Sequence, residues 1–238
     1  MMEPINNQLS QYINQLESLV CSKQEEINRY KYAMIRTLVS MLEVKDEITG
    51  KHLERVREYV EIIINGLKEK GYYLDIIENW DVGLVSDSSQ LHDVGKAGVP
   101  DGILLKEGKL SDSEFSIVKR HPEMGVVILE KIEIFTVNDF LYHAKVMAAS
   151  HHEKWDGSGY PLGLKRDDIP LEGRIMAVAD VYDALTNVRP YKKAYTHSES
   201  MGILLKESGH TLDPIVVKVF TDNACEIKKT YARYSTQI

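Results

Sequence analysis

Two stretches of the sequence decide how this chain folds: residues 91–110 read LHDVGKAGVPDGILLKEGKL, and residues 151–161 read HHEKWDGSGYP. The first contains the adjacent pair His92 and Asp93, and the second contains the adjacent pair His151 and His152. Imidazole and carboxylate together suit iron, manganese and other first-row divalent ions, whereas calcium prefers oxygen alone and structural zinc often uses thiolate. The two stretches therefore predict a metal site with mixed nitrogen and oxygen ligands.

The rest of the sequence is helical in pattern. Apolar residues recur at helical spacing, few strand-like alternations occur, and Gly or Pro residues separate the segments. Thr49 is placed to cap a helix running towards Lys70, which Gly71 would end. The pairs Ser111–Asp112 and Ser198–Glu199 are typical helix starts. The sequence predicts an all-α bundle, with further helices over residues 76–91, 113–120, 125–132, 139–150, 171–186, 198–208 and 215–228.

The N-terminal residues follow a heptad pattern. Apolar residues stand at every seventh position, namely Ile13, Val20, Ile27, Met34 and Met41, with Leu16 and Tyr30 at the alternate heptad sites. This spacing predicts a long helix over residues 1–45 that forms a homodimer as a coiled coil, followed by a second domain over residues 46–238. The alternative is a single amphipathic helix folded back on its own domain. Lys23 and Thr37, at seam positions, count against the coiled coil.

Charge and cysteine content exclude several classes of protein. The net charge is -7 over 238 residues, so a DNA-coating surface of clustered cations is not expected. Cys21 and Cys225 lie far apart and outside any paired motif, which argues against a disulfide framework. The apolar runs are too short to span a membrane, and the N-terminus lacks the features of a signal peptide. We therefore expect a cytoplasmic protein.

The His92–Asp93 pair favours a site with more than one ion. On one helix, adjacent ligands can point to neighbouring ions, and a carboxylate can bridge them. Two ions a few ångströms apart activate a water and hold both the attacking and the leaving oxygen of a phosphoryl transfer. Other histidines and carboxylates in similar settings are His52, His121, Asp180 and Asp183. Together these residues predict metal-dependent phosphoryl-transfer chemistry.

The first quoted stretch resembles the HD half of the HD-GYP family, and the second resembles its GYP half. The similarity continues through His121–Pro122 with Gly125, through RIMAVADVYDALTNVRPYKKA at residues 174–194, and to Leu212–Asp213–Pro214, covering about Thr37 to Phe220. It implies that residues 46–238 form an HD-superfamily helical bundle with catalytic activity. The implied reaction is hydrolysis of cyclic di-GMP to linear pGpG, to GMP or to both.

The resemblance also implies which residues bind metal. Asp93 would bridge two ions, one held by His121, His151 and His152 and the other by His52, His92 and Asp180. Family members thought to hold three metals carry a Glu four residues before the first His, where this chain has Ile48. An apolar side chain cannot be a ligand, so the sequence predicts two divalent ions, Fe or Mn.

Four residues are candidates for contact with the substrate. Lys96 lies four residues after His92, so on a helix its ammonium would share that face and reach a phosphate oxygen. Arg189 and Lys192 resemble the family's second phosphate clamp, the alternative being a basic helix end. Tyr160 lies in a tight glycine-rich loop, residues 156–161 (DGSGYP), and would stack on a guanine or serve packing only. In the family, this loop is also implicated in contacts with diguanylate cyclases.

Asp183 is one helical turn after Asp180 and shares its face, which suits a carboxylate that orients a ligand or handles a proton. We therefore count Asp183 with Asp93 and Lys96 as candidate catalytic residues. Two other functions stay open. One is hydrolysis of 3′,3′-cyclic GMP-AMP, because base selection depends on the shape of the pocket. The other is a weakly active sensor or scaffold that binds cyclic di-GMP.

Overall fold

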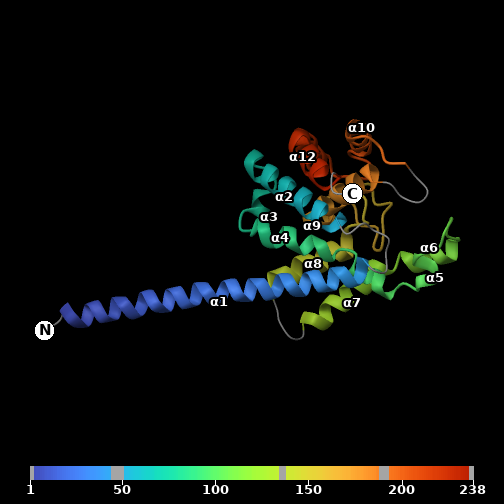
Figure 1. The fold of residues 1–238 in the computed structure, drawn as a ribbon. Helices are drawn as coiled ribbons and strands as arrows, with labels where there is room; N and C mark the ends of the chain where they lie inside the picture. Colours follow the sequence, from blue (N-terminus) through green and yellow to red (C-terminus); the bar gives the residue numbers. More distant parts are fainter. Residues whose placement is uncertain (1–2, 44–50, 134–137, 188–192, 236–238) are drawn as a thin grey trace. The chain divides into compact units, whose positions relative to one another are not determined.

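The computed structural model describes residues 3–43, 51–133, 138–187 and 193–235. In these ranges the chain is built of helices and the segments between them, without a β-strand, and Ser208 and Leu212 form one isolated bridge (Figure 1). The predicted all-α fold is therefore confirmed. The chain divides into two compact units, Met1–Met41 and Leu42–Ile238.

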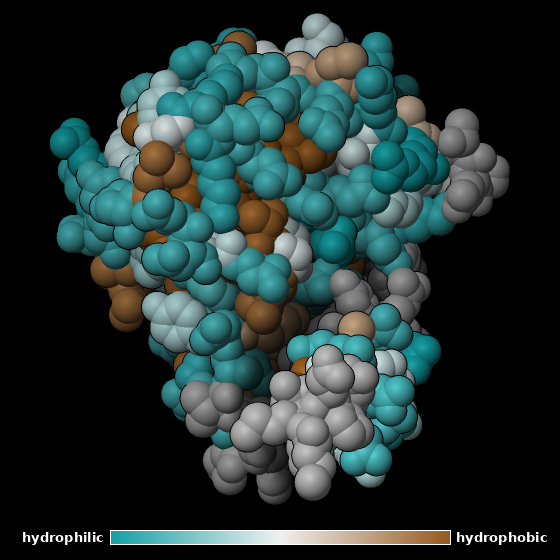
Figure 2. Space-filling model, turned by 90° about the vertical axis from the view of Figure 1, so that its left-hand side faces the viewer, coloured by the Kyte–Doolittle hydropathy of each residue, from teal (hydrophilic) through white to brown (hydrophobic). Residues whose placement is uncertain are grey.

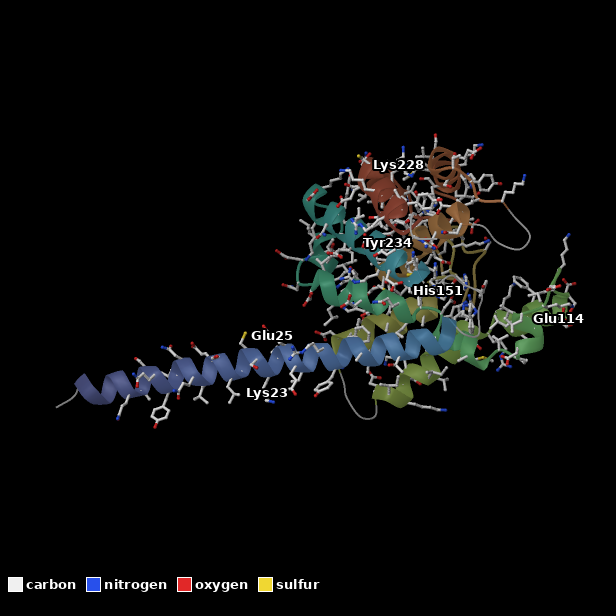
Figure 3. The ribbon with its side chains drawn as sticks, in the orientation of Figure 1. Lys23, Glu25, Glu114, His151, Lys228 and Tyr234 are labelled. Carbon is white, nitrogen blue, oxygen red and sulfur yellow. The ribbon has the colours of Figure 1, made fainter. Side chains whose placement is uncertain are left out.

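The first unit is a single helix, α1 (Glu3–Glu43), about 60 Å long at 1.5 Å per residue. Large apolar side chains along it are exposed, namely Leu9, Tyr12, Ile13, Leu16, Leu19, Val20, Ile27 and Tyr30. Lys23 Nζ lies 2.6 Å from Glu26 Oε2, and Lys23 and Glu25 project from opposite sides of the helix (Figure 3). Ile13, Val20 and Ile27, with Leu16 and Tyr30, form an exposed apolar stripe at coiled-coil spacing within this unit.

The second unit is organised around α2 (His52–Lys70). Its apolar face is fully buried and includes Val56, Tyr59, Val60, Ile63, Ile64 and Leu67. The helix ends, as predicted, at Gly71, whose φ of 74° lies in the left-handed region that glycine adopts without strain. Thr49, the predicted cap, lies outside the described residues. The helix places His52 in its first turn, at the edge of the core.

Helices α8 (Asp139–Ser150) and α9 (Leu171–Thr186) have the predicted bounds and pack against each other, and α9 also packs against α2. Tyr182 of α9 meets Tyr59 and Phe220 edge to face in the core, with ring centroids 5.2 and 5.0 Å away. At Gly173 an added Cβ would lie 2.2 Å from Ser150 Oγ. This glycine therefore allows α9 to approach the end of α8 that leads into His151.

The predicted helix over residues 76–91 is broken into α3 (Leu74–Ile77), α4 (Val82–Ser88) and the 3₁₀ turn η1 (Ser89–Leu91). Asp81 causes the new start, because its side chain accepts the Leu84 N–H and caps α4. The next element is another 3₁₀ turn, η2 (Val94–Gly98). His92 and Asp93 therefore lie between two short turns and not on one helix, which corrects the sequence-based prediction.

Gly95 in η2 passes against the start of α7 (His121–Glu133). An added Cβ there would lie 1.8 Å from the His121 carbonyl oxygen and 2.4 Å from Gly125 N. Only glycine permits this approach, which brings Asp93 beside His121.

Six further elements complete the described part of the second unit. They are α5 (Asp101–Leu104), α6 (Asp112–Val118), η3 (Arg166–Asp168), α10 (His197–Glu207), α11 (Pro214–Asp222) and α12 (Ala224–Ser235). Of these, α10, α11 and α12 pack on α2 and α9. Helix α6 starts at the predicted Ser111, in a capping box with Glu114. Helix α10 is capped by Thr196, which forms a capping box with Glu199, and so it begins at His197 and not at the predicted Ser198–Glu199 pair.

The predicted helix over residues 215–228 is divided at Asn223 into α11 and α12. Glu58 of α2 fixes α12 by accepting hydrogen bonds from Thr230, Arg233 and Tyr234. On the face shown in Figure 2, hydrophilic side chains predominate and apolar groups show through in separate patches. None of the helices in the described part of the chain is both long enough and apolar enough to cross a bilayer.

Candidate metal centre

A first cluster of predicted ligands forms where η2, α7 and the end of α8 meet. Asp93, His121, His151 and His152 each offer one ligand atom, and these atoms all lie within 4.8 Å of one another. Asp93 Oδ1 lies 3.2 Å from His121 Nε2 and 3.6 Å from His151 Nε2. His151 is placed inside the helical unit, among the side chains of several elements (Figure 3).

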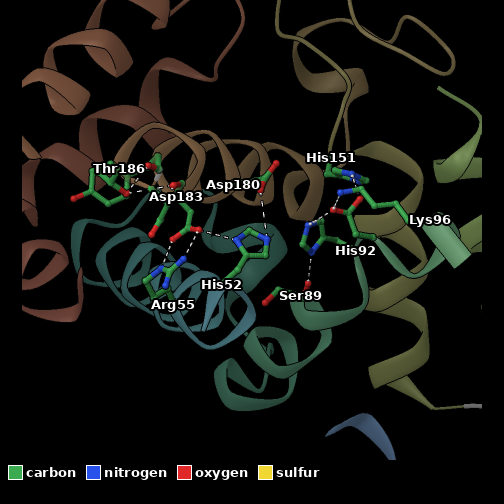
Figure 4. Close-up of polar contacts among 12 residues, drawn as sticks. His52, Arg55, Ser89, His92, Lys96, His151, Asp180, Asp183 and Thr186 are labelled. Carbon is green, nitrogen blue, oxygen red and sulfur yellow. Dashed lines mark hydrogen bonds and ion pairs between the residues drawn. The ribbon is translucent and has the colours of Figure 1, made fainter. Parts of the chain in front are cut away.

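A second cluster joins α2, η1 and α9. His52, His92 and Asp180 also offer ligand atoms within 4.8 Å of one another. His52 Nε2 is 3.7 Å from Asp180 Oδ1 (Figure 4). The structure thus gathers all seven predicted ligands into two groups, and the division is the one that the family resemblance implies.

Asp93 faces both groups. Its Oδ1 lies beside His121 and His151, whereas its Oδ2 lies 3.3 Å from His92 Nε2. Lys96 Nζ is 2.8 Å from the same Oδ2. This is the placement that a carboxylate bridging two ions needs.

The imidazole rings are oriented by the partners of their Nδ1 atoms. In three rings Nδ1 is within hydrogen-bond distance of a carbonyl oxygen three or four residues earlier: His92 with Ser89 at 2.8 Å, His121 with Val118 at 2.8 Å, and His151 with Met147 at 2.9 Å. His52 Nδ1 instead lies 2.7 Å from Asp183 Oδ2. A ring that donates from Nδ1 leaves the Nε2 lone pair free for a metal.

His152 is held by ring contacts. Tyr160 stacks on it with centroids 4.7 Å apart and planes at 26°, and His151 lies 4.1 Å away. Burial and the neighbouring His151 lower the pKa of His152 to about 2. Burial raises the pKa of Tyr160 to about 12. His152 is therefore neutral, as a metal ligand must be, and the Tyr160 hydroxyl is protonated.

The clusters fit divalent metal ions. His52 Nε2 and His92 Nε2 are buried and make no hydrogen bond within the described residues, so each needs a partner that a metal ion would supply. Burial disfavours the ionised form of Asp93, yet Lys96 and His92 hold its pKa well below the usual range. Nearby histidines likewise outweigh burial and lower the pKa of Asp180. Ionised carboxylates, and imidazoles that release their proton when a metal binds, suit first-row divalent ions.

The centre opens to solvent on one side. The side chains of Asp93, Lys96 and Asp180 are each about one-fifth exposed, at 18%, 22% and 23%, whereas those of His92 and His121 are at most 1% exposed. A phosphate group could therefore approach along Lys96. The expected shared helical face of Lys96 and His92 is absent, because η2 is a 3₁₀ turn and directs Lys96 to Asp93, three residues earlier. Ile48, Arg189 and Lys192 lie outside the described residues.

Two further residues, Arg55 and Glu153, support the centre. Arg55 is buried and makes a two-pronged ion pair with Asp183. Its signal in the sequence is its position, one turn after His52. Glu153 accepts the backbone N–H groups of Leu162 and Leu164 at 2.8 and 2.9 Å, which fixes the glycine-rich loop beside the His151–His152 doublet.

Residues 36–216 match the HD domain family. The chain is 42% identical over 207 residues to a protein of Vibrio cholerae serotype O1 named probable cyclic di-GMP phosphodiesterase, covering 86% of this chain and 47% of that protein. It is 38% identical over 192 residues to the 3′3′-cGAMP-specific phosphodiesterase 2 of the same organism, covering 80% of this chain and 34% of that one. The fold resembles that of Bd1817, an HDGYP protein from Bdellovibrio bacteriovorus, with a TM-score of 0.52 and 19% identity over 74% of this chain and 53% of that one.

Proposed function

This chain belongs to the HD domain family, in its HD-GYP group, and we propose that it is a phosphodiesterase that hydrolyses cyclic di-GMP with two divalent metal ions. The observation that carries the proposal is Asp93, whose two oxygens face two separate groups of ligands. The chain spans about half the length of the phosphodiesterase that it matches, so the proposal concerns the chemistry of this domain.

The seven clustered side chains define the proposed site. His121, His151 and His152 would hold one ion, His52, His92 and Asp180 the other, and Asp93 both. Bound iron or manganese would supply Lewis acidity and lower the pKa of a water at the site. Lys96, beside Asp93 on the open side, would neutralise a phosphate oxygen of the substrate.

The glycine-rich loop would shape the pocket. Tyr160 packs on His152 and so keeps this metal-binding side chain in place. Its ring would also offer an aromatic edge to a base of the substrate. Arg189 and Lys192 keep their proposed role as a second phosphate clamp, on the strength of the family resemblance. The loop would also be the contact for a diguanylate cyclase partner.

The test uses the full chain purified without oxygen and loaded with Fe(II) or Mn(II). We expect linear pGpG, GMP or both from cyclic di-GMP, and no product from metal-free protein or from Asp93→Ala. Tight binding of cyclic di-GMP without turnover by the loaded protein would instead identify a sensor or scaffold, and the phosphodiesterase proposal would be wrong.

A second candidate substrate is 3′,3′-cyclic GMP-AMP. It is favoured by the 38% identity to a relative that is specific for that dinucleotide. Parallel assays at equal concentrations of both cyclic dinucleotides decide between them. We expect the larger kcat/KM for cyclic di-GMP.

We also propose that α1 forms a coiled-coil homodimer. Its exposed apolar stripe supports this, because such a stripe is stabilised when a second copy covers it. Sedimentation should give a dimer for the chain and a monomer for Ile13→Asp/Val20→Asp, with cyclic di-GMP hydrolysis per chain as a second readout. A monomeric parent chain would refute this proposal.

The cytoplasmic location predicted from two unpaired cysteines is a further proposal, and cell fractionation tests it.

A further inference from the structure

Arg55 and Asp183 form a buried ion pair directly behind the second ligand cluster. Their exposures are 4% and 2%. Arg55 Nε donates to Asp183 Oδ1 at 2.6 Å, and the terminal nitrogen Nη2 donates to Oδ2 at 2.9 Å (Figure 4). The guanidinium therefore holds both oxygens of the carboxylate.

Asp183 in turn contacts His52. His52 Nδ1 lies 2.7 Å from Asp183 Oδ2, on the opposite side of the ring from Nε2, which faces Asp180 at 3.7 Å. Burial opposes ionisation of Asp183, but Arg55 and His52 together outweigh it and lower the pKa of that carboxyl. Both oxygens of Asp183 are thus engaged, which favours the orienting role over proton handling.

We propose that Arg55 is a positioning residue for the metal centre. It fixes the plane of the Asp183 carboxylate, which fixes the orientation and tautomer of His52 and so the direction of the Nε2 lone pair. This inference rests on the proposed function of His52 as a metal ligand.

The geometry explains why an arginine stands there. The terminal torsion of an aspartate is broad, so a carboxylate held at one oxygen can rotate. A planar guanidinium that donates to both oxygens removes that freedom, whereas a lysine ammonium is a point charge without a fixed plane. A lysine at position 55 would keep the charge and lose the orientation.

A matched pair on the same helix separates positioning from general stabilisation. Arg57 Nε lies 2.5 Å from Asp87 Oδ1, so α2 carries a second arginine–aspartate pair two residues further on. Arg57 Nη1 also donates to Glu61, and neither Asp87 nor Glu61 is a predicted ligand. Arg57→Lys is therefore the control for Arg55→Lys.

The experiment is a metal-binding titration of the full chain with Mn(II) against a competing chelator, with elemental analysis of the loaded protein. We expect Arg55→Lys to lower the affinity for one of the two ions by about 10- to 100-fold, which is the usual effect of removing a partner of a metal ligand. The affinity for the other ion should not change. Arg57→Lys should leave both affinities within about twofold. Asp183→Asn, which keeps the size of the side chain, should lower the affinity for that same ion.

Unchanged affinity for both ions in Arg55→Lys would overturn the inference, as would an equal loss in Arg57→Lys. Thermal unfolding of the metal-free variants by circular dichroism shows whether each is folded, and Asp183→Asn serves if Arg55→Lys is not. The inference and the proposed function fail separately. A parent chain that binds two ions but hydrolyses no cyclic dinucleotide would refute only the function.

Discussion

The two ligand clusters differ in how one of their histidines, His52, is held in place. In the first, His121 and His151 are oriented by main-chain carbonyl groups of the helical turns that carry them. In the second, His52 is oriented by a charged side chain, Asp183, which Arg55 fixes in turn. His121 and His151, like His92 of the second cluster, are thus oriented by the backbone, whereas the orientation of His52 depends on two further side chains. The clusters should therefore respond to different substitutions.

The largest effect is expected where the clusters meet. Asp93→Ala removes the carboxylate that faces both groups, so we expect both ions to be lost. Hydrolysis should fall by about 10³-fold or more, since metal Lewis acidity is worth several kcal/mol. Elemental analysis and the rate with cyclic di-GMP test this. Retention of two ions per chain would contradict a bridging role.

The backbone of the first cluster can be disturbed without touching a ligand. Gly95→Ala would place a Cβ 1.8 Å from the His121 carbonyl oxygen, whereas Gly102→Ala meets nothing within 4 Å. We expect Gly95→Ala to lower the free energy of unfolding by about 3 kcal/mol or more, as in severe overpacking, and to weaken the metal at the first cluster. Gly102→Ala should change stability by less than about 1 kcal/mol. Urea unfolding of the two variants provides the comparison.

Removing one histidine from each cluster sharpens the comparison. His121→Ala and His52→Ala should each lower the metal content from about two ions per chain to about one. The two singly loaded proteins should retain ions at different clusters. The double variant His121→Ala/His52→Ala should therefore bind none. Loss of both ions in each single variant would show that the clusters do not bind metal independently.

Arg55→Lys distinguishes the clusters more gently, as described above. A smaller effect still is expected at Tyr160. Its pKa is raised to about 12, so the hydroxyl stays protonated between about pH 6 and 9 and does not titrate with activity. Tyr160→Phe keeps the ring on His152, and we expect the rate to change by less than about threefold and the pH profile to keep its shape. Tyr160→Ala should cost about tenfold. A loss near 100-fold in Tyr160→Phe would identify the hydroxyl as an acid catalyst.

Helices bounded by strong local signals could be predicted from the sequence. Residues 139–150 and 171–186 have the predicted bounds because apolar periodicity and the end signals agree there. The breaks at Asp81 and Asn223 were missed because apolar spacing continues across them. At Asp81 the cap of α4 decides the break, and a single carboxylate is a weak signal in a sequence.

The ligand set could be predicted as a group, but its geometry could not. The sequence predicted His92 and Asp93 as neighbours on one helix. In the structure they lie between two 3₁₀ turns, and Asp93 faces both clusters. That arrangement depends on the contact between Gly95 and His121, which are 26 positions apart by sequence number. Arg55 was missed because a charged residue on an amphipathic helix is usually exposed. Only the fold shows that it is buried against Asp183.

Glu153 directly follows the His151–His152 doublet. It accepts hydrogen bonds from the backbone N–H groups of Leu162 and Leu164, just after the glycine-rich loop. Tyr160 N also donates to the His152 carbonyl oxygen, and an added Cβ at Gly159 would lie 2.4 Å from Lys154 N. The loop and the doublet are thus one mechanical unit. We therefore expect a displacement of the loop to move both His151 and His152, whereas His52 lies on α2.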